Sequence, residues 1–244
     1  MYYVGVDLAW GERNPTGVAA VDADGVLRHV GAARSDDDVL AQLEPFVDGP
    51  CVVAFDPPLV VVNPSGNRPC EAALNRDFRR FDAGTHPANT GLAWFADGGR
   101  AARLAAALRL DLDPRSGSAR KAFEVYPHAA SVALFGLAKT LKYKQKQGRE
   151  IVQMRSELLR LMDFIEGLDD LAVTASADWL ALRTAVRAAT RKSQLRRAED
   201  PVDAVLCAYI ARFATVRPAE VTVYGDVESG CIVTPRLLTF QSDR

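Results

Sequence analysis

The segment from Tyr2 to Trp10 constrains the fold more than any other, because it is an apolar strand with one acid in it. Alternate residues of a strand point to opposite faces, so Val4, Val6 and Leu8 would share one face and Asp7 would lie on the other. Apolar residues on both faces are typical of a central strand covered by helices. A carboxylate there is costly unless a cation or a donor compensates it. Asp7 is therefore either a hydrogen-bonded structural residue or part of a metal or substrate site.

The charge is unevenly distributed along the 244 residues, a length that suits one large domain or one domain with an insertion. The net charge is −1, so no basic field over the whole molecule indicates nucleic-acid binding. The segment 139–197, however, holds 13 Lys and Arg against 7 Asp and Glu. We interpret the chain as a single domain, 1–244, with an insertion at 63–120 and a basic helical segment at 139–197.

The cysteines and the apolar segments indicate a cytoplasmic protein without a membrane partner. The four cysteines are scattered and form no CxxC pair, which argues against a zinc cluster and against a disulfide framework. We expect neither a signal peptide nor a transmembrane segment, because the residues from Tyr2 onward read as a strand and no apolar run reaches membrane-spanning length.

Periodicity and turn residues predict the order β-β-β-α-β for the first 55 residues. The expected elements are strands at 2–8, 16–21, 26–33 and 51–55, with a polar turn at 11–14 and a helix from the N-cap Ser35 to about Val47. Beyond them we expect short helices at 71–80 and 98–110, a strand at 122–127, helices at 131–141, 151–167 and 175–197, a last helix starting at Asp200-Pro201, and a C-terminal hairpin within 221–233.

Five acids stand where local structure does not require them. Asp7 lies mid-strand, Asp56 ends an apolar strand, Glu124 lies within a strand, and Asp200 and Asp203 open the last predicted helix. Clustered carboxylates repel one another unless a divalent cation neutralises them, and oxygen ligands select Mg²⁺ or Mn²⁺. Structural roles are open for each: an N-cap for Asp200, a helix-dipole partner for Asp203, a turn for Asp56 and a sheet-edge ion pair for Glu124.

The order of these motifs resembles a known family. Gly5-Val6-Asp7-Leu8-Ala9-Trp10, Ala54-Phe55-Asp56-Pro57-Pro58, Glu124-Val125-Tyr126-Pro127, Tyr143-Lys144 with Arg149, and Glu199-Asp200-Pro201-Val202-Asp203-Ala204 are similar to the DUF429 family of predicted nucleases with a ribonuclease H-like fold. The resemblance implies an α/β fold with a mixed five-stranded sheet, three antiparallel strands followed by parallel strands, flanked by helices, with an insertion and extra C-terminal helices.

The resemblance also implies roles for particular residues. Metal ligands would be Asp7, Asp56, Asp200 and Asp203; catalytic residues would be Asp7, Asp56, Glu124, Asp203 and Lys144; and Arg68, Lys144 and Arg149 would bind substrate. The function so implied is metal-dependent hydrolysis of a phosphodiester in DNA or RNA, with Mg²⁺ or Mn²⁺ as cofactor. By analogy with the wider superfamily, the protein is compatible with forming a homodimer.

Two alternatives remain open at this point. Gly5-x-Asp7 with Thr16-Gly17 faintly resembles the first phosphate loop of sugar-kinase and actin-type phosphotransferases. Those proteins use two such domains, whereas one copy would take up nearly all of this chain, and the sequence has no second glycine-rich phosphate loop. The other alternative is a non-catalytic nucleic-acid-binding module that keeps the fold.

Overall fold

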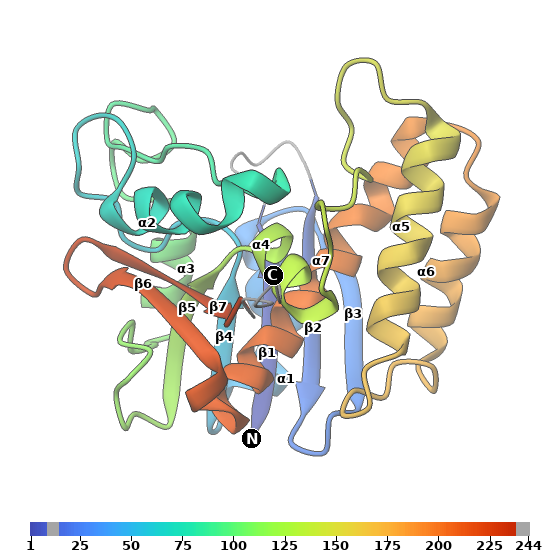
Figure 1. The fold of residues 1–244 in the computed structure, drawn as a ribbon. Helices are drawn as coiled ribbons and strands as arrows, with labels where there is room; N and C mark the ends of the chain where they lie inside the picture. Colours follow the sequence, from blue (N-terminus) through green and yellow to red (C-terminus); the bar gives the residue numbers. More distant parts are fainter. Residues whose placement is uncertain (9–14, 238–244) are drawn as a thin grey trace, which may run out of the picture.

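The computed structural model describes residues 1–8 and 15–237 (Figure 1), so Trp10 and the polar turn predicted at 11–14 lie outside it. The elements are β1 (Tyr2–Asp7), β2 (Thr16–Asp22), β3 (Leu27–Ala33), α1 (Asp36–Val47), β4 (Cys51–Phe55), α2 (Pro69–Phe78), η1 (Arg79–Phe81), α3 (Arg100–Ala107), β5 (Arg120–Val125), α4 (Pro127–Phe135), α5 (Ile151–Glu166), α6 (Ala177–Ala188), α7 (Lys192–Val216), η2 (Pro218–Glu220), β6 (Val221–Asp226) and β7 (Gly230–Pro235). None of these helices is both long and apolar enough to cross a membrane.

The strands of the described ranges form one sheet in the order β3-β2-β1-β4-β5-β7-β6. β1 pairs antiparallel with β2 and parallel with β4, and β4 pairs parallel with β5. This arrangement confirms the expected fold class, with three antiparallel strands followed by parallel ones. The C-terminal hairpin of β6 and β7 extends the same sheet beyond β5.

Helices cover both faces of the sheet (Figure 1). Val4 and Val6 of β1 pack on the face covered by α1 and α3. Tyr3 packs on the opposite face, where α7 lies across β1 and β2 and is joined by α4, α5 and α6. Since Asp7 has the same strand parity as Tyr3, its carboxylate lies on the α7 face.

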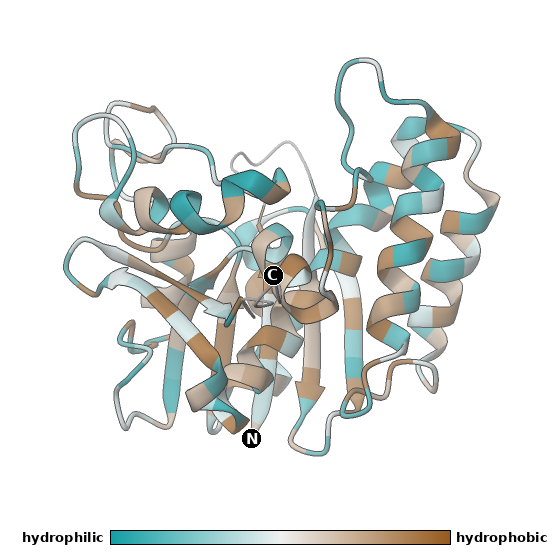
Figure 2. Cartoon of the chain, in the orientation of Figure 1, coloured by the Kyte–Doolittle hydropathy of each residue, from teal (hydrophilic) through white to brown (hydrophobic). Residues whose placement is uncertain are grey.

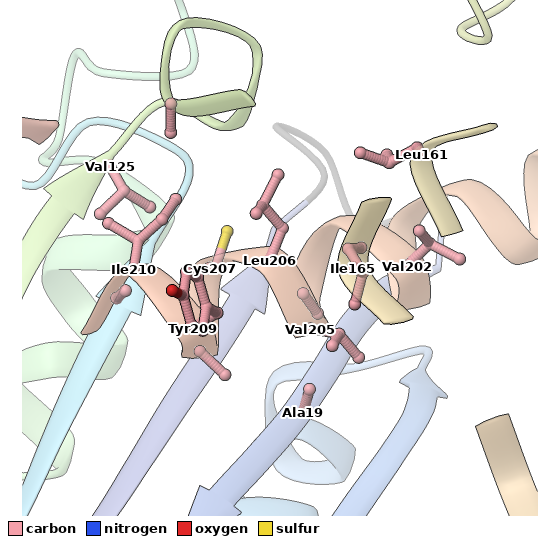
Figure 3. Close-up of a cluster of buried hydrophobic side chains, with 14 of the residues drawn as sticks. Ala19, Val125, Leu161, Ile165, Val202, Val205, Leu206, Cys207, Tyr209 and Ile210 are labelled. Carbon is pink, nitrogen blue, oxygen red and sulfur yellow. The ribbon is translucent and has the colours of Figure 1, made fainter. Parts of the chain in front are cut away.

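Helix α7 is the centre of the larger core. Figure 3 shows Val205 of α7 beside Ala19 of β2, with Ile165 of α5 nearby, and all three side chains are fully buried. Each fully buried aliphatic side chain contributes roughly 1.5–3 kcal/mol. In Figure 2 the hydrophobic colours concentrate on the central strands and α7, whereas the loop between α4 and α5 is hydrophilic.

Two glycines allow α7 to lie close to the sheet. A Cβ atom built on Gly5 of β1 would lie 2.0 Å from the carbonyl oxygen of Ala204, and one on Gly17 of β2 would lie 1.9 Å from that of Asp200. Gly17 is the register partner of Asp7. The two glycines thus bring the acid-bearing turn of α7 next to the end of β1.

We expect Gly5→Ala to lower the free energy of unfolding by roughly 3 kcal/mol, because α7 must move away from the sheet to admit the methyl group. Gly49→Ala is the matched control, since a Cβ there would meet no atom within 4 Å. Urea unfolding of both variants measures the difference. Equal midpoints in the two variants would contradict the close-approach argument.

The boundaries of three predicted helices were wrong. The helix predicted at 175–197 ends at Ala188, and α7 begins at Lys192 rather than at Asp200. The side chain of Gln194 accepts hydrogen bonds from the backbone N–H groups of Thr190 and Arg191 at 2.8 and 2.9 Å, which starts α7 early.

Helix α4 runs from Pro127 to Phe135 instead of 131–141. Proline suits a first helical position, and Gly136 at φ 59° ends the helix. As a result, residues 137–150 form a long connection that carries Lys144.

Candidate functional site

Acids from three separate elements meet at one edge of the sheet. β1 and β4 are parallel neighbours, so their carboxyl ends lie side by side, and the backbone N–H of Asp56 donates to the carbonyl of Val6 at 3.0 Å. Asp7 ends β1 and Asp56 directly follows β4, and both acids line the same cavity. Helix α7 adds Asp203, which is fully buried, and Asp200.

Lys144 occupies the centre of these acids. Its Nζ lies 2.6 Å from Oδ2 of Asp203 and 3.2 Å from Oδ2 of Asp7. The hydroxyl of Tyr143 donates to Oδ1 of Asp203 at 2.7 Å. Nη1 of Arg149 donates to the carbonyl of Lys144 at 2.6 Å, so Arg149 holds the backbone that presents the ammonium group.

Burial and mutual repulsion raise the pKa values of Asp7, Asp56 and Asp200. Burial raises the pKa of Asp7 to about 6, a rise that Lys144 opposes. The pKa of Asp56 is raised well above its usual range by burial and by Asp7, and that of Asp200 is raised to about 8 by burial and by Asp7. Burial alone would lower the pKa of Lys144, but Asp203 and Asp7 raise it well above its ordinary value. The single ammonium group of Lys144 therefore cannot neutralise all the carboxylates of the cluster.

Glu199 is a further acid of this cluster that we did not predict as a site residue. Its side chain is 4% exposed, and its Oε1 is buried without a hydrogen-bond partner among the described residues. Burial raises its pKa to about 7. It precedes Asp203 by four residues, a spacing that places both on one face of a helix. The spacing of Glu199 and Asp203 was missed because the last helix was predicted to begin at Asp200, one residue after Glu199.

The donor set suits a hard cation in its chemistry. The donors are carboxylate oxygens, which hard cations prefer. Two of them, Oε1 of Glu199 and Oδ2 of Asp203, are buried and accept no hydrogen bond from the described residues. The ammonium group of Lys144 lies 2.6 Å from Oδ2 of Asp203. In the positions that the described side chains take, no three His, Cys, Asp or Glu residues are arranged to hold a metal ion. The ammonium of Lys144 stands between the acids instead.

Glu124 and Arg68 form a separate, buried ion pair. Nη1 and Nη2 of Arg68 donate to the two carboxylate oxygens of Glu124 at 2.8 and 2.5 Å, and Nε donates to Glu71 at 2.9 Å. Arg68 also donates to the carbonyl of Val60, and Glu124 accepts from the backbone N–H of Leu59. Arg68, expected to bind substrate, is 1% exposed and directs these donors to protein oxygens.

Strand parity explains why Glu124 does not join the other acids. Phe123 and Val125 belong to the core on the α7 face, whereas Ala122 belongs to the core beneath α1 and α3. Glu124 alternates with Phe123 and therefore leaves β5 toward the face opposite to Asp7. The pair with Arg68 ties the start of the 63–120 segment to β5.

Two cavities adjoin the acid cluster and share Asp56, Lys144, Gln145 and Lys146. The first, of about 620 Å³, is also lined by Asp7, Leu8, Gln147, Lys192, Arg196, Glu199 and Asp200. The second, of about 780 Å³, extends between residues 82–86 and 140–149. The acids and Lys144 thus lie between two hollows in the surface.

Comparison with known proteins places the chain in a family. Comparisons with curated proteins and with solved structures give no match. A family model described as "Protein of unknown function (DUF429)" matches residues 5–229, which include Asp7, Asp56, Glu124, Lys144 and Asp203. The chain therefore belongs to the DUF429 family.

Proposed function

We propose that this protein is a divalent-metal-dependent nuclease that hydrolyses phosphodiester bonds. The observation that supports this most is the convergence of Asp7, Asp56, Asp200 and Asp203 from two parallel strand ends and one helix at one sheet edge, where a single ammonium group pairs with Asp7 and Asp203. An excess of buried acids over cations at one sheet edge favours the binding of a hard cation.

Asp7 and Asp203 would hold Mg²⁺ or Mn²⁺, with Asp56 and Asp200 completing the donor set. A bound divalent ion supplies Lewis-acid activation of water and neutralises charge on the scissile phosphate. Lys144 would leave its position between the carboxylates when the ion enters. Its ammonium group, still tethered beside the acids, would then hold a phosphate oxygen.

The cations around the first cavity favour a phosphate-rich substrate. Lys146, Lys192 and Arg196 line that cavity, and none of the three forms an ion pair with a described residue. Cations that no acid neutralises attract the phosphate backbone of nucleic acid. DNA and RNA both have a phosphate backbone, so these cations suit either one.

Gly5 and Gly17, on which the phosphotransferase alternative rests, also have a packing role, because a Cβ atom on either one would meet the backbone of α7. Binding of ATP in a protein without nuclease activity would favour that alternative. The non-catalytic alternative predicts a folded protein that binds neither metal ion.

A metal titration followed by thermal unfolding tests the proposal. We expect Mg²⁺ and Mn²⁺ to stabilise the wild type, by about 2.7 kcal/mol at 100 times the dissociation constant, and to stabilise Asp7→Asn much less. Lys144→Met should bind the ion about tenfold more tightly, because the competing ammonium is gone. Lys146→Met, which removes a neighbouring cation with no ion pair to a described residue, should match the wild type.

Two outcomes count against the metal site. One is an equal shift in wild type and Asp7→Asn, which would place the ion elsewhere. The other is the absence of any shift in both wild type and Lys144→Met, which would leave Lys144 as the permanent counter-ion of the acids.

A further inference from the structure

The second cavity has the dimensions of a binding site for one nucleotide. Its volume of about 780 Å³ lies within the range of roughly 300–1,000 Å³ that proteins use to enclose a small ligand. It adjoins Asp56 and Lys144, and residues 84–86 and 140–142 also line it. A ligand in this cavity would therefore lie directly beside the acid cluster.

Buried side chains close the inner end of this cavity. Arg68, Glu71 and Glu124 line it and are 1%, 1% and 4% exposed, and they are bonded to one another. The cavity therefore has a floor of ion-paired protein side chains. A nucleotide at the end of a strand can be seated against this floor, beside the acids.

The charges in the wall leave two cations for a ligand. Arg68 is compensated by Glu71 and Glu124, and Lys142 lies 3.0 Å from a carboxylate oxygen of Asp82. Lys146 and Arg149 line the cavity without an ion pair to any residue of the described ranges. Two such cations suit a phosphate group.

Rings form another part of the wall. Tyr126 and His128 both line the cavity, and their ring centroids are 5.7 Å apart. Rings in a nucleic-acid site provide stacking surfaces that accept any base. The wall therefore offers contacts both for a phosphate and for a nucleobase.

We propose that this cavity binds the terminal nucleotide of a single strand, so that the enzyme removes nucleotides from single-stranded ends. The inference extends the proposed nuclease function by naming its substrate class. Lys146 and Arg149 hold the terminal phosphate, and Tyr126 and His128 contact the base. The next phosphodiester then lies at the acids, where one water adds to phosphorus and the P–O3′ bond breaks, so that a 5′-mononucleotide with a free 3′ hydroxyl leaves and the shortened strand begins with a 5′ phosphate.

The first test compares linear with covalently closed circular single strands of the same sequence, each made as DNA and as RNA, in the presence of Mn²⁺. We expect cleavage of the linear strand to mononucleotides and at least 100-fold slower cleavage of the circle. Cleavage of circle and line at equal rates would overturn the end-binding inference while leaving the nuclease proposal intact.

The second test measures binding of AMP and dAMP without metal by calorimetry, so its result does not depend on catalysis. We expect Arg149→Glu and Lys146→Glu each to weaken binding at least tenfold, and the control Arg187→Glu, an exposed charge reversal on α6, to leave it unchanged. Binding that is equal in all variants, or absent from the wild type, would overturn the inference. Binding lost in these two variants, in a protein that cleaves no strand, would support the nucleotide site and refute the nuclease proposal.

Discussion

Replacing Asp7 by asparagine is expected to lower the rate of metal-dependent phosphodiester cleavage by about 10³-fold. Asp7 approaches both Lys144 and Asp56, so it contributes to the charge of the whole acid cluster. Metal-ion catalysis contributes several kcal/mol, and a loss of about 4 kcal/mol corresponds to this factor. The side chain keeps its size, and Lys144 keeps its contact with Asp203, so the variant should remain folded.

The measurement is single-turnover cleavage of a labelled linear strand in Mg²⁺ and in Mn²⁺, with circular dichroism to verify folding. Asp37→Asn is the matched control, because Asp37 is exposed in the first turn of α1, away from the acid cluster. A folded Asp7→Asn protein with wild-type cleavage would refute the assignment of Asp7.

Replacing Arg68 by methionine is expected to lower the free energy of unfolding by roughly 3–5 kcal/mol, because it leaves buried charge without a partner. Arg68 is 1% exposed, and its loss leaves the buried carboxylates of Glu71 and Glu124 without their counter-ion. The variant Arg28→Ala, which removes an exposed pair with Asp22, should cost at most about 1 kcal/mol. Urea unfolding of the metal-free proteins measures both values.

The double variant Arg68→Met/Glu124→Leu separates a structural from a catalytic role for this pair. Replacing both charges with apolar groups should recover part of the lost stability, because no charge of the pair is left unmatched. If the pair acts only through the fold, the folded double variant keeps measurable cleavage. A stable double variant without activity would instead support the catalytic role predicted for Glu124.

Local patterns determined much of the fold. Strand alternation identified β1 and separated Asp7 from Val4 and Val6, and Ser35 accepts the expected capping hydrogen bond from the backbone N–H of Asp38 at 3.1 Å. These features depend on residues within one or two turns of each other, so periodicity and capping chemistry predict them. The family resemblance assigned Asp7, Asp56 and Asp203 to one site, and the fold brings them to one edge of the sheet.

Tertiary structure alone decided the rest of the site. The approach of α7 to the sheet depends on Gly5 and Gly17, which lie beneath Ala204 and Asp200. The sequence contained Lys144 and Glu199, but only the folded chain places the ammonium of Lys144 between Asp203 and Asp7 and buries Glu199 beside them. Such contacts join residues more than 50 positions apart. Their geometry follows from packing of whole elements, which no local preference of the chain encodes.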